Sequence, residues 1–284
     1  MNRIKIIADS TCDLSPQLRD KYDVDIVPLF VCLGDKTYRD GTEITPDEVY
    51  QWADKNKTVP KTAAVSPDDI RRAFTRYIDE GCDIFYTGIS SEMSASYQIA
   101  VMAANEIAPE RIAVLDSRNL STGIGHSVIR AAELAAGGMG VHEIEKELRE
   151  NFVDKVRASF LVDSTTYLRR GGRCSALASF GATALNIKPC IVVENGAMRP
   201  DVKFQGSIGR ALLKYAKKMT PNLLNARKER VFITHSGIDD EVLAKIKDYV
   251  DSLGYFDEVL ITRAGCVISS HCGYGTLGIL YVDK

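Results

Sequence analysis

Short apolar runs alternate with amphipathic segments along the first half of the chain. The apolar runs have the length of β-strands and cover residues 4–8, 24–33, 84–87 and 112–115. Small polar clusters follow three of them, at residues 9–11, 88–91 and 116–117. Strands that lead into polar loops and then into helices predict a parallel sheet covered by helices. Ligands collect beyond the carboxyl ends of the strands in such sheets.

Helix start signals separate these strands. Residues 45–48, Thr-Pro-Asp-Glu, form a capping box with an N-cap hydroxyl, a proline at the first helical position and a glutamate at the third. Residues 66–67, Ser-Pro, repeat the first part of this signal. The remaining predicted helices of this half follow Ser94 and cover residues 123–136 and 141–152.

The second half has a different pattern. A strand is predicted over 156–162, and Asn195-Gly196 between two apolar stretches is a strong hairpin signal. Further elements are predicted as helices over 207–219 and 239–253 and as strands over 231–234, 258–262 and 276–282. Hairpins beside helices predict an α+β domain with a mixed or antiparallel sheet. We therefore expect two domains, an N-terminal α/β domain (1–155) and a C-terminal α+β domain (156–284).

Length and composition are consistent with this division. A chain of 284 residues exceeds what one compact core usually holds. The formal charge of −2 argues against a general nucleic-acid or membrane-surface binder. No apolar run is long enough to span a membrane and the first residues lack a signal-peptide pattern, so we expect a cytoplasmic protein. The seven cysteines show no metal-site or redox spacing, and no metal site is predicted.

Candidate ligand-binding side chains follow the predicted strands. Ser90, Ser91 and Ser94 place hydroxyls at the start of a helix, where free N–H groups favour a carboxylate or phosphate. Serine is also a common helix cap, and capping alone would explain these residues. Thr62, just before another helix, is either a hydroxyl donor to the same pocket or an ordinary loop residue.

Two further clusters are glycine-punctuated. His271 lies in a predicted loop over 269–276, where Gly273 permits close backbone approach to a ligand. This histidine is either an anion donor or a structural residue. Arg169, Arg170 and Arg173 surround Gly-Gly at 171–172 and would bind a phosphate or an acidic partner, or form a solvated turn.

Familiar catalytic motifs are absent from the sequence. There is no Gly-x-Ser-x-Gly elbow, because residues 88–92 lack the closing glycine. There is also no Walker A motif, no Gly-x-Gly-x-x-Gly after a strand and no His-Glu-x-x-His. Asp9 and Asp13 do not have Asp-x-Asp spacing, and Asp9 is expected to organise the loop after the first strand.

Taken in order, several of these segments resemble the DegV family across nearly the whole chain. The matching segments are Ala-Asp-Ser-Thr-Cys-Asp-Leu at 8–14, Asp-Gly at 40–41, Lys-Thr at 61–62, Ile-Ser-Ser at 89–91, Ser-Ala-Ser-Tyr-Gln at 94–98, Asp-Ser at 116–117, Tyr-Leu-Arg-Arg-Gly-Gly-Arg at 167–173, Leu-Asn-Ile-Lys-Pro at 185–189 and His-Cys-Gly-Tyr-Gly at 271–275. Each segment alone is weak, but their shared order is specific.

The resemblance implies a function as well as a fold. Family members consist of two α/β domains that hold one long-chain fatty acid in an internal tunnel, and they are not themselves enzymes. Related bacterial proteins deliver the acid to a separate kinase subunit that phosphorylates its carboxylate. By this resemblance Thr62 and Ser94 bind the carboxylate and His271 assists. We name Ser91, Ser96 and Gly273 as supporting residues, and Arg170 and Arg173 as contacts for the kinase or its nucleotide. No cofactor is expected.

Two departures bear on specificity rather than on binding. The usual Ser-Gly-Thr of the family is Ser-Ala-Ser at 94–96, and Tyr274 stands where the family has proline. We expect Tyr274 to line or narrow the mouth of the site. Two alternatives stay open. One is a stand-alone phosphotransferase or hydrolase that uses Asp9, Ser94 and His271. The other is a carrier of a different amphipathic anion, such as an isoprenoid acid or a phospholipid.

Overall fold

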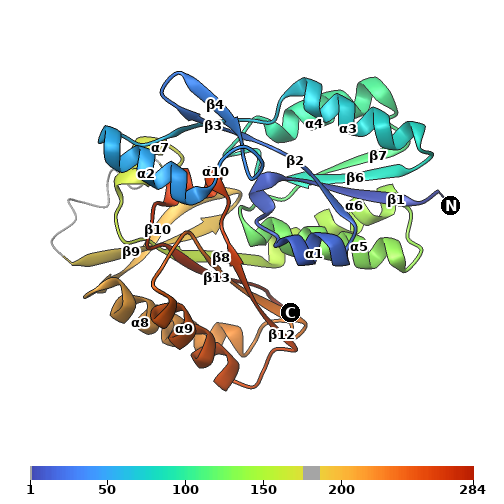
Figure 1. Ribbon diagram of the computed structural model, residues 1–284. Coiled ribbons are helices and arrows are strands. Elements are labelled where there is room, and N and C mark those ends of the chain that lie inside the picture. Colours follow the sequence, from blue (N-terminus) through green and yellow to red (C-terminus); the bar gives the residue numbers. More distant parts are fainter. Residues whose placement is uncertain (1, 175–185) are drawn as a thin grey trace.

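The computed structural model describes residues 2–174 and 186–284, and it has two large sheets with helices between and around them (Figure 1). Within these ranges a four-stranded sheet belongs to the N-terminal half and a six-stranded sheet to the C-terminal half. A small three-stranded sheet lies beside them. This arrangement confirms the predicted mixed α/β fold.

The four-stranded sheet is parallel throughout, as the strand–helix alternation predicts. Its strands, in spatial order, are β2 (Val24–Val27), β1 (Ile4–Asp9), β6 (Asp83–Gly88) and β7 (Ile112–Asp116). Helices α3 (Pro67–Asp79) and α4 (Ser96–Ile107) cover one face; α1 (Pro16–Lys21), α5 (Thr122–Ala136) and α6 (Val141–Asn151) cover the other (Figure 1). The carboxyl ends of β1 and β6 lead into the short 3-10 helix η1 (Ser10–Cys12) and the loop before α4.

The six-stranded sheet is mixed, with β11 and β12 parallel and the other neighbours antiparallel. Its order is β10 (Ala197–Gln205), β9 (Ile187–Glu194), β8 (Val156–Leu161), β13 (Leu277–Val282), β11 (Arg230–His235) and β12 (Glu258–Arg263). Helices α8 (Ile208–Leu223) and α9 (Asp240–Ser252) cover its outer face (Figure 1). The buried helix α5 lies between the two large sheets, where His126 bonds to the carbonyl of Leu280 on β13.

A small antiparallel sheet and three helices lie between the two halves of the chain and connect them. The antiparallel sheet β4 (Lys36–Arg39), β3 (Phe30–Leu33), β5 (Lys61–Ala63) and helix α2 (Pro46–Asn56) lie beside α7 (Thr166–Gly171) and α10 (Cys266–Cys272) (Figure 1). The predicted single strand over 24–33 is therefore wrong, because it divides into β2 and β3 of different sheets. Pro28 lies at the division, where its missing N–H cannot join a ladder.

Two segments predicted to be irregular are helical. Residues 269–272, expected in a loop, belong to α10, and most of 167–173 belongs to α7. Both helices are short, and Gly265, the N-cap residue of α10, donates its N–H to Asp13, which is more than 200 residues away in sequence. Local sequence signals could not supply those contacts, which explains why the predicted loop is wrong.

Other local predictions are confirmed. Thr45 and Glu48 form the capping box of α2, with both reciprocal hydrogen bonds present. The Asn195-Gly196 turn joins β9 to β10. The chain passes from the 3-10 helix η2 (Val153–Lys155) into β8 near the predicted domain boundary at residue 155, which stays a prediction. Leu185, part of one family segment, lies outside the described residues.

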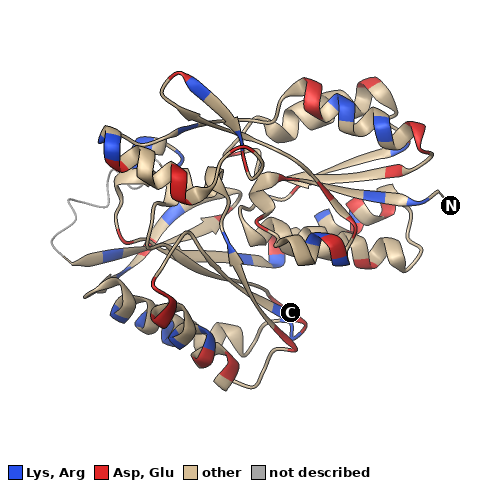
Figure 2. Ribbon diagram, in the orientation of Figure 1, with Lys and Arg blue, Asp and Glu red and all other residues tan. Residues whose placement is uncertain are grey.

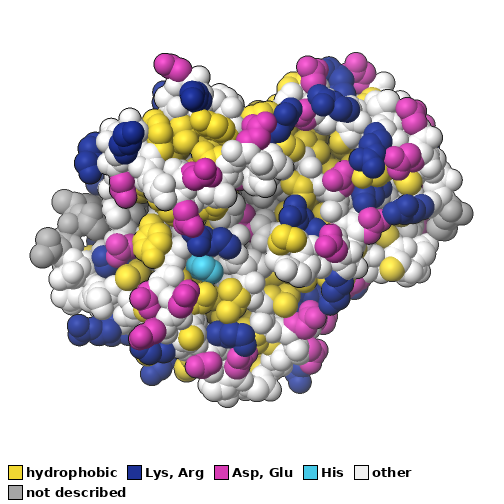
Figure 3. Space-filling view, in the orientation of Figure 1, with side chains coloured by type: hydrophobic (Ala, Val, Ile, Leu, Met, Phe, Trp, Pro, Cys, Tyr) yellow, Lys and Arg dark blue, Asp and Glu magenta, His cyan; other side chains and the backbone are white. Residues whose placement is uncertain are grey.

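Charged side chains of both signs are interspersed over the helices of both halves (Figure 2). On the face seen in Figure 3, hydrophobic side chains gather over the region of β3, β4 and α2. No helix within residues 2–174 and 186–284 combines the length and apolarity needed to cross a membrane.

Candidate ligand-binding site

A cavity of about 40 Å³ lies where β5, the loop before α4 and helix α10 meet. Its lining is mostly apolar, with four polar or charged side chains: Thr62, Ser94, Arg173 and His271. The apolar lining residues are Leu29, Ala63, Ala64, Ile89, Met93, Leu120, Met198, Val267, Ile268 and Cys272. The structure thus brings together the three residues named as carboxylate ligands, although they lie far apart in sequence.

His271 and Thr62 are in direct contact. His271 Nε2 lies 2.8 Å from Thr62 Oγ1, so α10 and β5 meet through this hydrogen bond. Burial, with a smaller effect of the Arg173 guanidinium, lowers the pKa of His271 to about 4. The imidazole is therefore neutral near pH 7, with one ring nitrogen a donor and the other an acceptor.

The other ring nitrogen of His271 lies against helix α7. His271 Nδ1 is buried without a hydrogen-bond partner among the described residues. A Cβ atom built on Gly171 would lie 2.3 Å from this nitrogen. Only glycine at position 171 leaves room for the ring as it stands. The histidine is thus held between Thr62 on one side and the backbone of α7 on the other.

Ser94 is supported by Ser96, which begins α4. The backbone N–H of Ser96 donates to Ser94 Oγ at 3.2 Å, and the two hydroxyl oxygens are 2.9 Å apart. Ser96 Oγ in turn accepts from the N–H of Val65 at 3.3 Å. If Ser96 donates its hydroxyl proton to Ser94, the Ser94 proton is free to point into the cavity. Helix α4 starts two residues after Ser94, close to the predicted position.

Four of the other named residues do not line this cavity: Ser91, Ser96, Gly273 and Arg170. Ser91 is exposed and donates its hydroxyl to Asp116 at 2.5 Å, so it organises the loop instead. Gly273 has a left-handed backbone (φ 76°), and a Cβ there would lie 2.7 Å from the Tyr167 ring. Arg170 is exposed on α7. Arg173, expected at a partner surface, lies at the cavity and bonds to the carbonyl of Gly171 at 2.8 Å.

A second cavity continues the first towards the six-stranded sheet. It measures about 20 Å³ and shares Leu120, Ile268 and Cys272 with the first. Phe160 and Leu280 line its far part. The two cavities hold only about three and about one or two water-sized groups, respectively. A long chain that follows this path must therefore push the shared side chains apart.

A larger cavity, about 560 Å³, lies between β8, the β9–β10 hairpin and α8. Its lining includes exposed charges of both signs, among them Asp154, Arg157 and Lys218, and none of the candidate ligand-binding residues named from the sequence. Size alone therefore does not identify the site. The smaller cavity has the apolar wall and the convergent donors that an amphipathic anion requires.

The acidic residues near the first strand do not reach the cavity. Asp9 is fully buried and accepts hydrogen bonds from the N–H groups of Thr11 and Ile89, as expected of a residue that organises its loop. Burial raises the pKa of Asp9 to about 6. No acidic side chain occurs among the described residues that line the cavity, so Asp9, Ser94 and His271 do not form a catalytic group there. The described residues also contain no cluster arranged to hold a metal ion.

Tyr274 does not line the mouth of the cavity, contrary to expectation. The residue is 57% exposed, and its ring packs edge-on against Tyr50, with ring centroids 5.9 Å apart. The sequence reasoning also missed the apolar lining. Leu120 and Met93 follow polar clusters at strand ends, and this position in the sequence could have marked them as part of the cavity lining.

Comparisons with known proteins identify the family of the chain. The model of the DegV family, described as an uncharacterised protein family, matches residues 3–284. A DegV domain-containing protein of Clostridium perfringens is 31% identical over 284 residues that cover all of both chains. A fatty acid-binding protein of Thermotoga maritima is 30% identical over 281 residues, which cover 97% of this chain and 96% of that protein.

The fold comparison gives the same result. The solved structure of a fatty acid-binding DegV family protein from Thermus thermophilus has a TM-score of 0.90 and 31% sequence identity. The match covers 99% of this chain and 100% of that chain. Because the family match, the sequence relatives and the fold all extend over nearly the whole length, the chain belongs to the DegV family.

Proposed function

We propose that this protein binds one long-chain fatty acid and is not itself an enzyme. The carboxylate lies at Thr62, Ser94 and His271, and the acyl chain follows the apolar cavities towards Phe160. The observation that carries this proposal is the convergence of Thr62, Ser94 and His271, with Arg173, in an otherwise apolar cavity. The names of two full-length relatives as fatty acid-binding proteins support it.

The hydrogen bonds suit an anionic head group. With Nε2 protonated, His271 donates to Thr62 Oγ1 across 2.8 Å, and the Thr62 hydroxyl is left to donate to the ligand. Ser94, which accepts from Ser96, does the same. Two hydroxyl donors backed by further donors therefore orient the carboxylate without a lysine clamp. Arg173 adds the positive charge at the cavity.

Apolar burial supplies most of the affinity. About fourteen buried methylene groups at about 0.8 kcal/mol each contribute roughly 11 kcal/mol before ordering costs. Part of this free energy is used to separate Leu120, Ile268 and Cys272, because the present cavities are narrower than an acyl chain. The same term favours a fatty acid over a short carboxylate, which would gain the head-group contacts alone.

A carrier of this kind needs an acceptor for its cargo, and we propose a separate fatty acid kinase subunit. One carboxylate oxygen attacks the γ-phosphorus of ATP, the bond from that phosphorus to the β-phosphate oxygen breaks, and acyl phosphate and ADP result. No cofactor is needed on this chain. Arg173 is placed to contact the head group or the incoming phosphate, and exposed Arg170 to contact the partner. Loading takes place in the cytoplasm, with at most transient membrane contact.

Calorimetric titration with oleate tests the binding proposal. Thr62→Val keeps the shape of the side chain and removes the hydroxyl, and it should weaken binding about 10- to 150-fold, as for a lost hydrogen bond to a charged group. Thr220→Val is the matched control, because Thr220 bonds to Tyr249 on the outer helices. Equal affinity of Thr62→Val and Thr220→Val proteins would place the carboxylate elsewhere.

The kinase proposal has its own test. Purified kinase subunit, ATP and oleate-loaded protein should together yield acyl phosphate, which hydroxylamine traps as a hydroxamate. Omission of any one component should abolish the product. Hydroxamate or phosphate release from this chain alone would favour the phosphotransferase or hydrolase alternative. Mass spectrometry of the bound ligand separates the fatty acid from another amphipathic anion.

A further inference from the structure

Two buried carboxylates hold the first turn of α10, the helix that carries His271. Asp13 Oδ1 accepts from the N–H of Gly265 at 2.7 Å, and Asp40 Oδ1 accepts from the N–H of Cys266 at 2.7 Å. Asp13 and Asp40 are 6% and 2% exposed. Both belong to the N-terminal half of the chain, more than 200 residues away from the helix they contact. The start of α10 is thus fixed by side chains from the other half of the molecule.

The second oxygen of each carboxylate is anchored as well. Ser121 donates its hydroxyl to Asp13, and Ser10 donates to Asp40 Oδ2 at 2.9 Å. A Cβ built on Gly265 would lie 3.2 Å from both oxygens of Asp40 and 3.3 Å from Asp13 Oδ1. The residue before the first turn of α10 therefore packs closely against both carboxylates. Because both oxygens of each carboxylate accept a hydrogen bond, neither side chain can follow a displaced helix freely.

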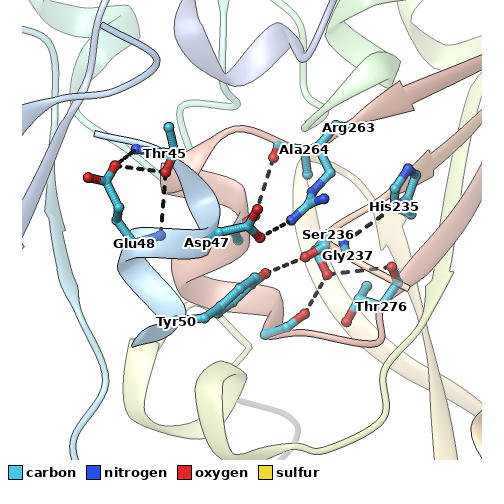
Figure 4. A network of polar contacts seen from close by, with 12 residues as sticks. Thr45, Asp47, Glu48, Tyr50, His235, Ser236, Gly237, Arg263, Ala264 and Thr276 are labelled. Carbon is cyan, nitrogen blue, oxygen red and sulfur yellow. Dashed lines mark hydrogen bonds and ion pairs between the residues drawn. The ribbon is translucent and has the colours of Figure 1, made fainter. Parts of the chain in front are cut away.

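The far end of α10 is held by a different set of contacts. Ser236 donates its hydroxyl to the carbonyl of Gly273, and the Tyr50 hydroxyl donates to the carbonyl of Ser236 at 2.6 Å (Figure 4). Before the first turn, Asp47 on α2 pairs with Arg263, the last residue of β12, at 2.7 Å (Figure 4). The contact between Ser236 and Gly273 limits rotation at the last turn. The direction of the helix axis depends on the first turn.

A small tilt of α10 is enough to disturb the ligand site. His271 lies six residues after Gly265, which at about 1.5 Å per residue places it about 9 Å along the axis. A tilt of about 6° that pivots at Gly265 therefore displaces the His271 end of the helix by about 1 Å. The 2.8 Å contact of His271 with Thr62 does not tolerate a shift of that size.

We infer that Asp13 and Asp40 are positioning residues of the ligand site, which set His271 against Thr62 by fixing the first turn of α10. This inference rests on the proposed function, because it gives these acids a role in holding the carboxylate. It assigns the acids no contact with the ligand. Their hydrogen bonds, rather than their charge, carry the role, since each oxygen that reaches α10 acts as an acceptor.

Paired substitutions separate positioning from general stability. Asp40→Asn and Asp13→Asn keep an acceptor oxygen for the helix and let the amide donate to the serine partner, so oleate affinity should stay within about threefold of wild type. Asp40→Ala and Asp13→Ala remove the acceptor, and affinity should fall at least tenfold. Tyr215→Phe is the control, because it removes buried hydrogen bonds to Ser159 and the N–H of Ile279 away from α10.

Titration of His271 by proton NMR gives a readout that needs no ligand. A displaced α10 exposes the imidazole, so its pKa should rise from about 4 towards its ordinary value in the alanine variants and stay low in the asparagine and Tyr215→Phe variants. If an alanine variant of either acid does not fold, Gly265→Ala takes its place. Its added methyl group presses against the same two carboxylates and should shift the pKa of His271 in the same direction.

The two proposals fail in different ways. Wild-type protein that refuses oleate would overturn the proposed function, and the His271 titration would still test the positioning role. Wild-type protein that binds oleate, with alanine variants of unchanged affinity and unchanged His271 pKa, would overturn the inference alone. Equal losses in the alanine and asparagine variants would also overturn it, because charge rather than the acceptor geometry would then be responsible.

Discussion

The substitution Gly171→Ala places one methyl group beside His271 and tests whether ligand binding depends on the position of the imidazole. The added Cβ would lie 2.3 Å from His271 Nδ1, whereas ordinary contacts begin near 3.4 Å, so the ring must move by about 1 Å. Such a shift disrupts the hydrogen bond to Thr62, worth about 0.5–1.5 kcal/mol, and forces a strained rotamer of about the same free energy. Together these effects predict oleate binding that is weaker by about 5- to 150-fold.

The backbone itself should accept this change. Gly171 is the last residue of α7, and alanine is a better helix former than glycine by up to about 1 kcal/mol. This gain offsets part of the free energy of the displaced ring, so the melting temperature should fall only slightly while affinity falls. Gly209→Ala is the matched control, because Gly209 lies in α8 and its added Cβ would meet Val242, 3.0 Å away on α9. Titration calorimetry with oleate and a thermal melt of each protein measure both quantities.

Unchanged affinity in Gly171→Ala protein, together with a normal melt, would refute the reasoning. It would show that the carboxylate does not depend on the position of the imidazole. A loss of affinity that Gly209→Ala reproduces would likewise contradict it, because the effect would then come from helix packing in general.

Four further outcomes follow from the same contacts. Ser96→Ala removes the support of Ser94 and should weaken oleate binding about 2- to 13-fold, whereas Ser91→Ala should leave it unchanged, as titration would show. Because His271 has a pKa near 4, affinity should be constant between pH 6.5 and 8.5, and a fall as the pH rises through that range would indicate a charged imidazole. Asp9 binds its proton more tightly in the folded state, where its pKa is about 6, than in the unfolded state, where it is 3.8. Its ionisation therefore lowers the free energy of unfolding by up to about 3 kcal/mol as the pH rises from about 4 to 6. Denaturant titrations at several pH values should show that Asp9→Asn protein lacks this dependence of the free energy of unfolding on pH. Leu120→Trp should block the chain path, so that oleate binding is lost but octanoate binding, measured by competition, is retained.

Signals that lie within a few residues were sufficient for much of the fold. The capping box at Thr45 and the Asn195-Gly196 hairpin involve neighbours in sequence, and the structure has both. Pro28 marks the division between β2 and β3, but an apolar run on both sides of it concealed the break. Helix α8 continues through Pro221, beyond its predicted end, because it packs against the six-stranded sheet.

The candidate site depends on contacts that no local pattern contains. Ser94 could be placed near a helix start from its own neighbours, whereas the roles of Thr62 and His271 came from the family resemblance. Residues 269–272 of helix α10 were predicted to be a loop. The sequence around them does not reveal that Asp13 and Asp40, more than 200 residues away, stabilise the first turn of this helix. Arg173 was expected to face a partner, and only the fold shows that it lies at the cavity.

Native mass spectrometry of the purified protein, followed by denaturation and extraction, tests the central claim most directly. The account predicts one long-chain fatty acid per chain, and less of it in Thr62→Val than in Thr220→Val protein. An empty protein that also refuses added oleate and palmitate would contradict the account. A bound ligand of another class, such as a phospholipid, would contradict the choice of cargo.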